Sequence, residues 1–317
     1  MSSRTQIIDL IKNHKNILLL THKKPDGDAA GAVFAFSSAI NKIHGKNVKI
    51  IFDDYNQKFN LIATTKISNH VDSKNLDLVI ILDCAAKNRL GKFESLCENI
   101  TCVNIDHHIS NTNFADYNYV DANASSTSEI IYEFISEMGL LDEKIAAALY
   151  AGIISDTGGF RHSCTTSKTH AITSQLLSFK FPFTKIYNKL MMEKTLDEVN
   201  FLSSAIENLE IIPPLKLAIS YLKFEQINNA NNKFTGGLVE FIKNISDIEI
   251  AVMIIENENG ACKLSFRSDY TNVNEIAKHF NGGGHKLAAG GIVNLNIRQA
   301  KEKVIEVVKE NKRCKTE

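Results

Sequence analysis

The sequence predicts an α/β protein, with a doubly wound, mostly parallel sheet in its N-terminal part and a smaller α/β domain after it. Short, largely apolar runs, typical of buried parallel strands, cover residues 17–20, 48–52, 78–82 and 101–105. Helical patterns alternate with these runs and follow them. Such alternation favours a doubly wound sheet whose loops gather at one edge.

Length and charge narrow the classes of protein. A chain of 317 residues suits two domains, and an apolar fraction of 44% allows each of them a core. The 36 basic residues balance the 36 acidic ones, so the formal net charge is zero. This balance argues against a protein that coats long nucleic acid by bulk charge, and it favours short or small anionic substrates.

The sequence contains no recognisable targeting signal, and the spacing of its cysteines is typical of a protein from the interior of the cell. No run approaches the ~20 apolar residues of a membrane span, and the N-terminus lacks the apolar core of a signal peptide. The six cysteines include no C-x-x-C pair, which argues against both a zinc site and a disulfide framework. We therefore expect a soluble, cytoplasmic protein with reduced thiols and no membrane partner.

Polar residues stand where helices of the first domain are expected to begin: Asp28 before a helix over 29–44, Ser126 or Thr127 before a second helix, and Asp142 before a third. The third helix is apolar almost all round, so it must be buried, and it stops near Asp156. An unpaired carboxylate at the end of a buried helix would be costly. We therefore expect a cation or strong hydrogen-bond donors beside Asp156.

The second half of the chain begins with a helix over residues 195–208 and a double proline, Pro213-Pro214, which prevents further helix and is taken as the domain boundary. Two later strands flank an Asn-Gly turn and predict a hairpin. The expected elements are strands over 217–221, 248–255, 262–268 and 291–295, and helices over 274–280 and 298–310. The predicted domains are 1–192, a linker over 193–214, and 215–317, with a cleft between the two domains.

A group of acidic residues and histidines follows the predicted strands and the buried helix: His22, Asp26, Asp28, Asp83, His107 and Asp156. Because an open α/β sheet binds its ligands at the carboxyl ends of its strands, we expect these side chains to converge. Four carboxylates in one place would repel each other unless two divalent cations neutralised their charge. Oxygen and nitrogen ligands suit manganese well and magnesium tolerably. Two such ions favour hydrolysis of a phosphoester bond.

The same residues, with their neighbours, resemble the motifs of a known protein family. His22-x-x-Pro25-Asp26-Gly27-Asp28, Asp83, Asp106-His107-His108 and Asp156 resemble, in order, the four motifs of the DHH phosphoesterase superfamily. Asn281-Gly282-Gly283-Gly284-His285, with Arg267 before it, resembles the DHH-associated C-terminal domain. The likeness covers nearly the whole chain. It is strongest to the branch that degrades nanoRNA and dephosphorylates 3'-phosphoadenosine 5'-phosphate.

The resemblance implies a role for each matching position. His22 and Asp26 would bind one metal ion, and Asp28, His107 and Asp156 the other. Asp83 would bridge the two ions. His108 would donate a hydrogen bond or proton to the phosphoryl group or leaving oxygen, while Asp106 would orient an imidazole.

The glycine run predicts a second, anion-binding feature. Consecutive glycines let backbone N–H groups form a nest around an anion, so we expect Gly283, Gly284, His285 and Arg267 to hold a phosphate or a terminal nucleotide. Taken alone, such a run is more typical of a flexible turn, and Arg267 of a solvated strand face. Arg161 is a further candidate for a phosphate contact.

The expected activity is metal-dependent hydrolysis of short single-stranded RNA to 5'-mononucleotides, together with dephosphorylation of 3'-phosphoadenosine 5'-phosphate. Two enzymatic alternatives remain: a phosphodiesterase for linear or cyclic dinucleotides such as pApA, and a pyrophosphatase or polyphosphatase on the same core. A nucleotide-binding regulator without turnover is the non-enzymatic alternative. The sequence indicates no obligate protein partner and leaves a homodimer open.

Overall fold

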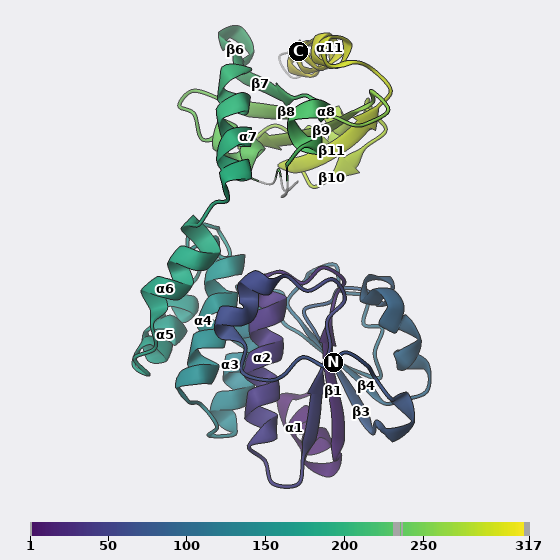
Figure 1. Ribbon diagram of the computed structural model, residues 1–317, viewed down its shortest axis with the longest axis vertical. Helices are drawn as coiled ribbons and strands as arrows, with labels where there is room; N and C mark the ends of the chain where they lie inside the picture. The colour runs from purple at the N-terminus through teal and green to yellow at the C-terminus, as the bar shows by residue number, and fades with distance from the viewer. Residues whose placement is uncertain (1, 231–234, 236, 314–317) are drawn as a thin grey trace. The chain divides into compact units, whose positions relative to one another are not determined.

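The computed structural model describes residues 2–230, 235 and 237–313, and for Arg313 it describes the backbone alone. Cys314 therefore lies outside the described residues. The chain divides into two compact units, Met1–Glu193 and Lys194–Glu317. Each unit has its own sheet and core, which confirms the predicted α/β class. Figure 1 shows both sheets.

The first unit is built on a five-stranded, wholly parallel sheet with the strand order β2-β1-β3-β4-β5. Its strands are β1 (Asn16–Thr21), β2 (Asn47–Ile50), β3 (Leu78–Leu82), β4 (Cys102–Asp106) and β5 (Tyr117–Val120). The three central strands are almost entirely buried because both of their faces are covered. The partly exposed edge strand β5 was not predicted, since its sequence Tyr-Asn-Tyr-Val has no continuous apolar run.

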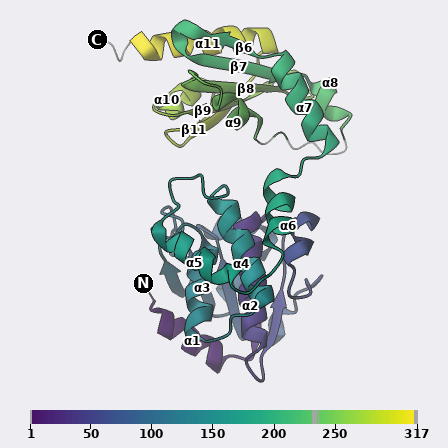
Figure 2. The same cartoon turned by 90° about the vertical axis from the view of Figure 1, so that its left-hand side faces the viewer.

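Helices cover one face of this sheet and pack against the strand residues that point toward them, such as Leu19 and Ile80. In Figure 2, α2, α3 and α4 run beside one another. The opposite face, which includes Leu18 and Ile81, is covered by a 3₁₀ segment, Lys87–Glu98. The helices are α1 (Arg4–Asn13), α2 (Gly27–Asn41), α3 (Thr127–Glu137), α4 (Glu143–Asp156), α5 (Ser167–Leu177) and α6 (Phe183–Tyr187), which a π turn (Asn188–Met192) extends.

The second unit has a mixed six-stranded sheet with the order β10-β11-β9-β8-β7-β6, in which only β7 and β8 are parallel. The predicted hairpin is confirmed by the antiparallel pair β8 and β9. The strands are β6 (Glu210–Ile212), β7 (Leu217–Leu222), β8 (Ile250–Glu256), β9 (Cys262–Ser268), β10 (Gly283–Gly284) and β11 (Ala288–Val293). The helices are α7 (Leu196–Glu207), α8 (Phe224–Asn228), α9 (Leu238–Lys243), α10 (Val273–Lys278) and α11 (Ile297–Arg313).

Pro213 and Pro214, predicted as the domain boundary, lie inside the second unit. Helix α7 belongs to the second unit, because its buried Phe201 and Ala205 pack with Ala218 and Leu222 in one core cluster. The prolines begin a 3₁₀ turn inside that unit, between the antiparallel strands β6 and β7. A double proline stops a helix, but here the helix had already ended, so the prolines mark a turn within a domain.

Among the described residues, no helix combines the length and the apolar character needed to cross a membrane.

Candidate active site

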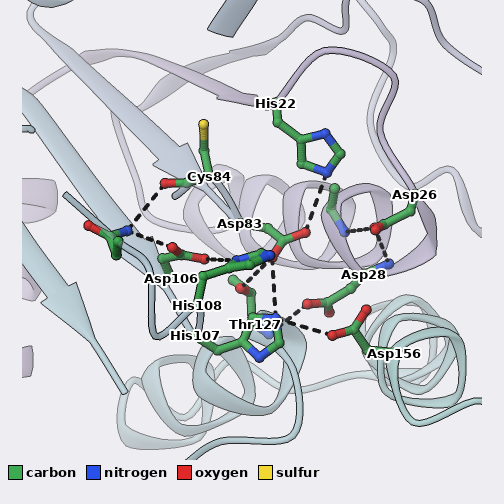
Figure 3. A network of polar contacts seen from close by, with 12 residues as sticks. His22, Asp26, Asp28, Asp83, Cys84, Asp106, His107, His108, Thr127 and Asp156 are labelled. Atoms are coloured by element: carbon green, nitrogen blue, oxygen red, sulfur yellow. Dashed lines mark hydrogen bonds and ion pairs between the residues drawn. The ribbon is translucent and has the colours of Figure 1, made fainter. Parts of the chain in front are cut away.

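Asp83 lies at the centre of the polar group at the carboxyl edge of the first sheet. It follows β3 directly, is only 2% exposed and has a positive φ of 56°, a conformation that few residues other than glycine adopt. Its Oδ2 atom lies 3.7 Å from His22 Nε2, and its Oδ1 atom lies 3.7 Å from His107 Nε2. Figure 3 shows its carboxylate between the two imidazoles.

Three groups of potential metal ligands meet there: His22 with Asp26 and Asp83; Asp28 with His107 and Asp156; and Asp83 with His107 and His108. Within each group, one ligand atom of every residue lies within 4.8 Å of the others. The structure therefore brings together all six residues predicted as metal ligands. Asp83 belongs to two of the three groups, and His107 links them to the third.

The two imidazoles are oriented as metal-binding histidines usually are. His22 Nδ1 lies 2.9 Å from the carbonyl of Lys23, and His107 Nδ1 lies 3.4 Å from that of Ala124. These contacts turn each Nε2 atom toward the carboxylates. The 3.7 Å separations from Asp83 are too long for hydrogen bonds, but they suit two donor atoms that each lie ~2.1 Å from a common ion. The donor set therefore fits divalent cations.

Asp28 was predicted to cap α2, but Asp26 has that role in the structure. Asp26, not Asp28, caps α2, since its side chain accepts from the backbone N–H groups of Asp28 and Ala29. Asp28 instead accepts from two N–H groups at the start of α3, about a hundred residues further along the chain. It is completely buried. A helix N-terminus therefore stabilises this carboxylate.

The metal-ligand geometry depends on close packing of α4 against α2 and α3. A Cβ atom on Gly152 of α4 would lie 1.9 Å from Ser128 Oγ and 2.9 Å from Asp28 Oδ1. Any larger side chain at this position would push α4 away from the carboxylate. Asp156, one turn further along α4, approaches His107 Nε2 at 3.1 Å.

Without cations, the site holds more negative charge than its surroundings neutralise. Burial and the charges of Asp83 and Asp156 raise the pKa of Asp28 well above its usual range. Burial lowers the pKa of His107, but the hydrogen bond to Asp156 and the nearby carboxylates outweigh it and raise that pKa to about 10. Burial and the charge of Asp83 also raise the pKa of Asp26. These shifts favour uptake of protons, and bound cations would replace those protons.

A chain of hydrogen bonds orients His108. Its Nδ1 atom donates to Asp106 Oδ1 at 2.7 Å, a contact that suits the orienting role implied for Asp106 by the resemblance. The other Asp106 oxygen accepts from Asn111 Nδ2 at 2.5 Å, and the same amide nitrogen lies 2.8 Å from Asn104 Oδ1. Sequence reasoning missed both asparagines, because an asparagine in or just after a strand is also typical of an ordinary turn.

Thr127 was predicted only as a helix cap. Its hydroxyl donates to Asp83 Oδ1 at 3.0 Å, and its backbone N–H donates to Asp28 Oδ2 at 2.6 Å. Ser126 is the residue that caps α3. The serine-rich run before α3 signals a helix start, but nothing local in the sequence relates Thr127 to Asp83.

Arg161 lies beyond the end of α4 with an exposed side chain, and its Nε atom donates to the carbonyl of Gly158 at 2.9 Å. This contact ties part of its guanidinium to the local turn.

The glycine run of the second unit is not the predicted nest. Gly283 and Gly284 form the short strand β10, paired with β11. The N–H of Gly284 donates to Asn274 Oδ1, that of Gly282 to Ala277, and that of His285 to Ala288. A Cβ atom on Gly284 would lie 2.6 Å from the carbonyl of Ala288. These glycines permit close strand pairing, so most of the N–H groups counted toward a nest are already bonded.

Arg267 and His285 nevertheless share one row of the second sheet. Arg267 pairs with Ala288 across β9 and β11, and Ala288 exchanges two backbone hydrogen bonds with His285. Residues paired in this way point to the same face. The guanidinium of Arg267 also contacts Glu240 at 2.7 Å.

Family models match both units: "DHH family, N-terminal domain" over residues 16–153 and "DHHA1 domain" over residues 216–311. The chain is 32% identical to the probable bifunctional oligoribonuclease and PAP phosphatase NrnA of Streptococcus mutans, over 92% of this chain and 93% of the relative. It is 28% identical to the bifunctional oligoribonuclease and PAP phosphatase NrnA of Bacillus subtilis, with the same coverage. An exopolyphosphatase-related protein from Bacteroides fragilis shares the fold, with a TM-score of 0.86 and 22% identity over 99% of this chain and 97% of that one. Motifs, geometry and relatives agree, and the chain belongs to the DHH family of phosphoesterases.

Proposed function

We propose that this protein hydrolyses short oligoribonucleotides to 5'-mononucleotides and removes the 3'-phosphate of 3'-phosphoadenosine 5'-phosphate. The observation that carries the proposal is the convergence of three ligand groups, linked through Asp83 and His107, in a chain that resembles NrnA relatives over 92% of its length. The relatives' names supply the substrates. The geometry supplies a site suited to phosphoester hydrolysis.

Enzymes of this family depend on metal ions, and we propose two divalent ions here, manganese in preference to magnesium. His22 and Asp26 would hold one, Asp28, His107 and Asp156 the other, with Asp83 shared. Mixed imidazole and carboxylate donors favour manganese. When bound, the ions neutralise phosphoryl charge and lower the pKa of the attacking water.

The protein's own residues would orient the substrate and move the proton. Nδ1 of His108 donates to Asp106, so Nε2 is the ring nitrogen left to serve a phosphoryl oxygen or the leaving oxygen. His108 is partly exposed at the edge of the site, whereas Asp83 is buried. Asp106, tied to Asn111, keeps the ring in one orientation, as an outer carboxylate does for a catalytic histidine.

Arg267, Gly283, Gly284 and His285 remain the proposed contacts to the nucleotide in the second unit. Arg267 and His285 lie on the same face of the sheet, separated by one strand and so roughly 10 Å apart along the row. That spacing suits an anionic group and its neighbouring sugar or base. Arg267 would exchange its contact with Glu240 for a phosphate, to which its planar guanidinium is well matched. Arg161 stays a further proposed phosphate contact.

The test is a panel of 5'-labelled RNAs from dinucleotides to long oligomers, with manganese and magnesium compared, beside 3'-phosphoadenosine 5'-phosphate, pApA and pyrophosphate. We expect the fastest turnover on RNAs of two to a few nucleotides and release of 5'-mononucleotides. Faster turnover of pyrophosphate, or turnover confined to pApA, would replace this proposal by the corresponding alternative.

A further inference from the structure

Thr127, at the start of α3, contacts two of the carboxylates at the metal site through different atoms. Its backbone N–H donates to Asp28 Oδ2 at 2.6 Å, and its hydroxyl donates to Asp83 Oδ1 at 3.0 Å. Asp28 lies in the first turn of α2 and Asp83 follows β3, so one residue on a third element links both. Figure 3 shows Thr127 beside these groups.

These contacts leave the side chains of Thr127, Asp28 and Asp83 little conformational freedom. Thr127, Asp28 and Asp83 are each at most 2% exposed, so neither the hydroxyl nor the carboxylates face bulk water. A carboxylate only accepts, so the threonine hydroxyl must be the donor. The same Oδ1 atom lies 3.6 Å from His108 Nδ1 and 3.7 Å from His107 Nε2. The hydroxyl therefore determines how the Asp83 carboxylate is turned toward the histidines.

The N–H of Ser128 completes the arrangement by donating to the other Asp28 oxygen at 2.9 Å. Both oxygens of Asp28 thus accept from the N-terminus of α3. The carboxylate plane of Asp28 is fixed to this helix, and through the Thr127 side chain the orientation of Asp83 is fixed to the same helix.

We propose that Thr127 is a positioning residue for the metal site, holding Asp28 and Asp83 in the mutual orientation that two divalent ions require. The hydroxyl is the part that mutation can remove, since the backbone donors remain in every variant. Loss of an outer partner of a metal ligand typically weakens metal binding by about 10- to 100-fold. The inference concerns the metal site on which the proposed function rests, but its test needs no substrate, so the two can fail separately.

The test compares Thr127→Val, which keeps the β-branched shape and loses the hydroxyl, with Thr127→Ser, which keeps it. Manganese affinity is measured by isothermal titration calorimetry on the full chain, and thermal unfolding is followed in chelator. Thr173→Val is the matched control, because Thr173 is a buried threonine whose hydroxyl donates to the carbonyl of Thr169 in α5, among groups outside the metal site.

We expect Thr127→Val to bind manganese about 10- to 100-fold more weakly than the parent, and Thr127→Ser and Thr173→Val to stay within about threefold of it. A purely structural threonine would lower the unfolding temperature in both valine variants and leave the affinity unchanged. Parental affinity in Thr127→Val, or an equal loss in Thr127→Ser, would overturn the proposal. Should Thr127→Val not fold, Thr127→Ala against Thr127→Ser makes the same comparison, since both side chains are smaller than threonine and introduce no clash.

Discussion

The carboxyl edge of the first sheet was predicted as a metal site, and the glycine segment of the second sheet, residues 281–285, as an anion-binding loop; the two regions are built in opposite ways. In the first, carboxylates such as Asp28 and Asp83 are buried and fixed by donors from α3. In the second, Gly283 and His285 are exposed, and most of the backbone N–H groups are bonded within the unit.

The comparison indicates which of the two regions must be rigid. A site that gathers like charges must be held together by buried donors, because the charges would otherwise separate or take up protons. A surface that contacts a nucleotide can remain open and can exchange one partner for another, as Arg267 would exchange Glu240 for a phosphate. We therefore expect substitutions in the first region to abolish turnover and those in the second to change substrate affinity.

The largest effect is expected for Asp83→Asn. Asparagine tolerates the positive φ of this position, so the backbone should remain as it is while the charge shared by the ligand groups is lost. Turnover of a ribodinucleotide should fall by more than about 10⁴-fold, the upper end of the loss expected for a single proton donor. Circular dichroism would check the fold, and a variant as active as the parent would contradict the central role of Asp83.

His108→Gln comes next. Loss of a proton donor typically lowers the rate by about 10²- to 10⁴-fold. The fall should appear in kcat with manganese affinity nearly unchanged, because the His108 ring bonds to Asp106 and the proposed ligand sets do not need it. Steady-state kinetics together with calorimetry separate these quantities. A loss of metal affinity as large as the loss of kcat would show that His108 is a ligand.

Arg267→Ala should raise KM for a ribodinucleotide by roughly 10- to 100-fold, the usual cost of a hydrogen bond to a charged group, with a smaller change in kcat. Glu240→Gln is the informative control, since it removes the competing negative charge beside Arg267. We expect an equal or lower KM in that variant. If both variants raise KM alike, Arg267 acts through its pair with Glu240 and not on the substrate.

The smallest effect is expected for Asp142→Ala, which removes the cap of α4, the helix that carries Asp156. Caps of this type contribute about 1 kcal/mol to the free energy of unfolding. Burial raises the pKa of Asp142, but the hydrogen bonds from Ile145 and Lys42 outweigh it and lower the pKa. A lowered pKa in the folded state means that the contribution of the charge is present above the unfolded pKa of about 3.9 and is lost as the pH falls through the folded value. Urea unfolding at pH 7 and at pH 3 should therefore show a smaller difference between variant and parent at the lower pH.

Much of the candidate site followed from local pattern. An apolar run that ends in a carboxylate or histidine predicts a buried strand with a polar group at its end, and this held for Asp83 and for Asp106-His107-His108. Errors arose where two local roles compete, as for Asp26 and Asp28, either of which could cap α2. Pro213-Pro214 lie inside the second unit because prolines indicate where a helix cannot continue, not which sheet a helix packs on.

The apolar runs and the helical patterns between them determined the fold class and the strand ends by themselves, and they predicted that the polar residues after the strands converge, because parallel strands present their carboxyl ends at one edge. Only the tertiary structure decided that Thr127 and the start of α3 hold Asp28 and Asp83, that Asn111 fixes Asp106, and that the glycine segment is a paired strand. The distances between these residues in space depend on how the helices and strands pack. That packing cannot be predicted from the residues next to each of them in the sequence.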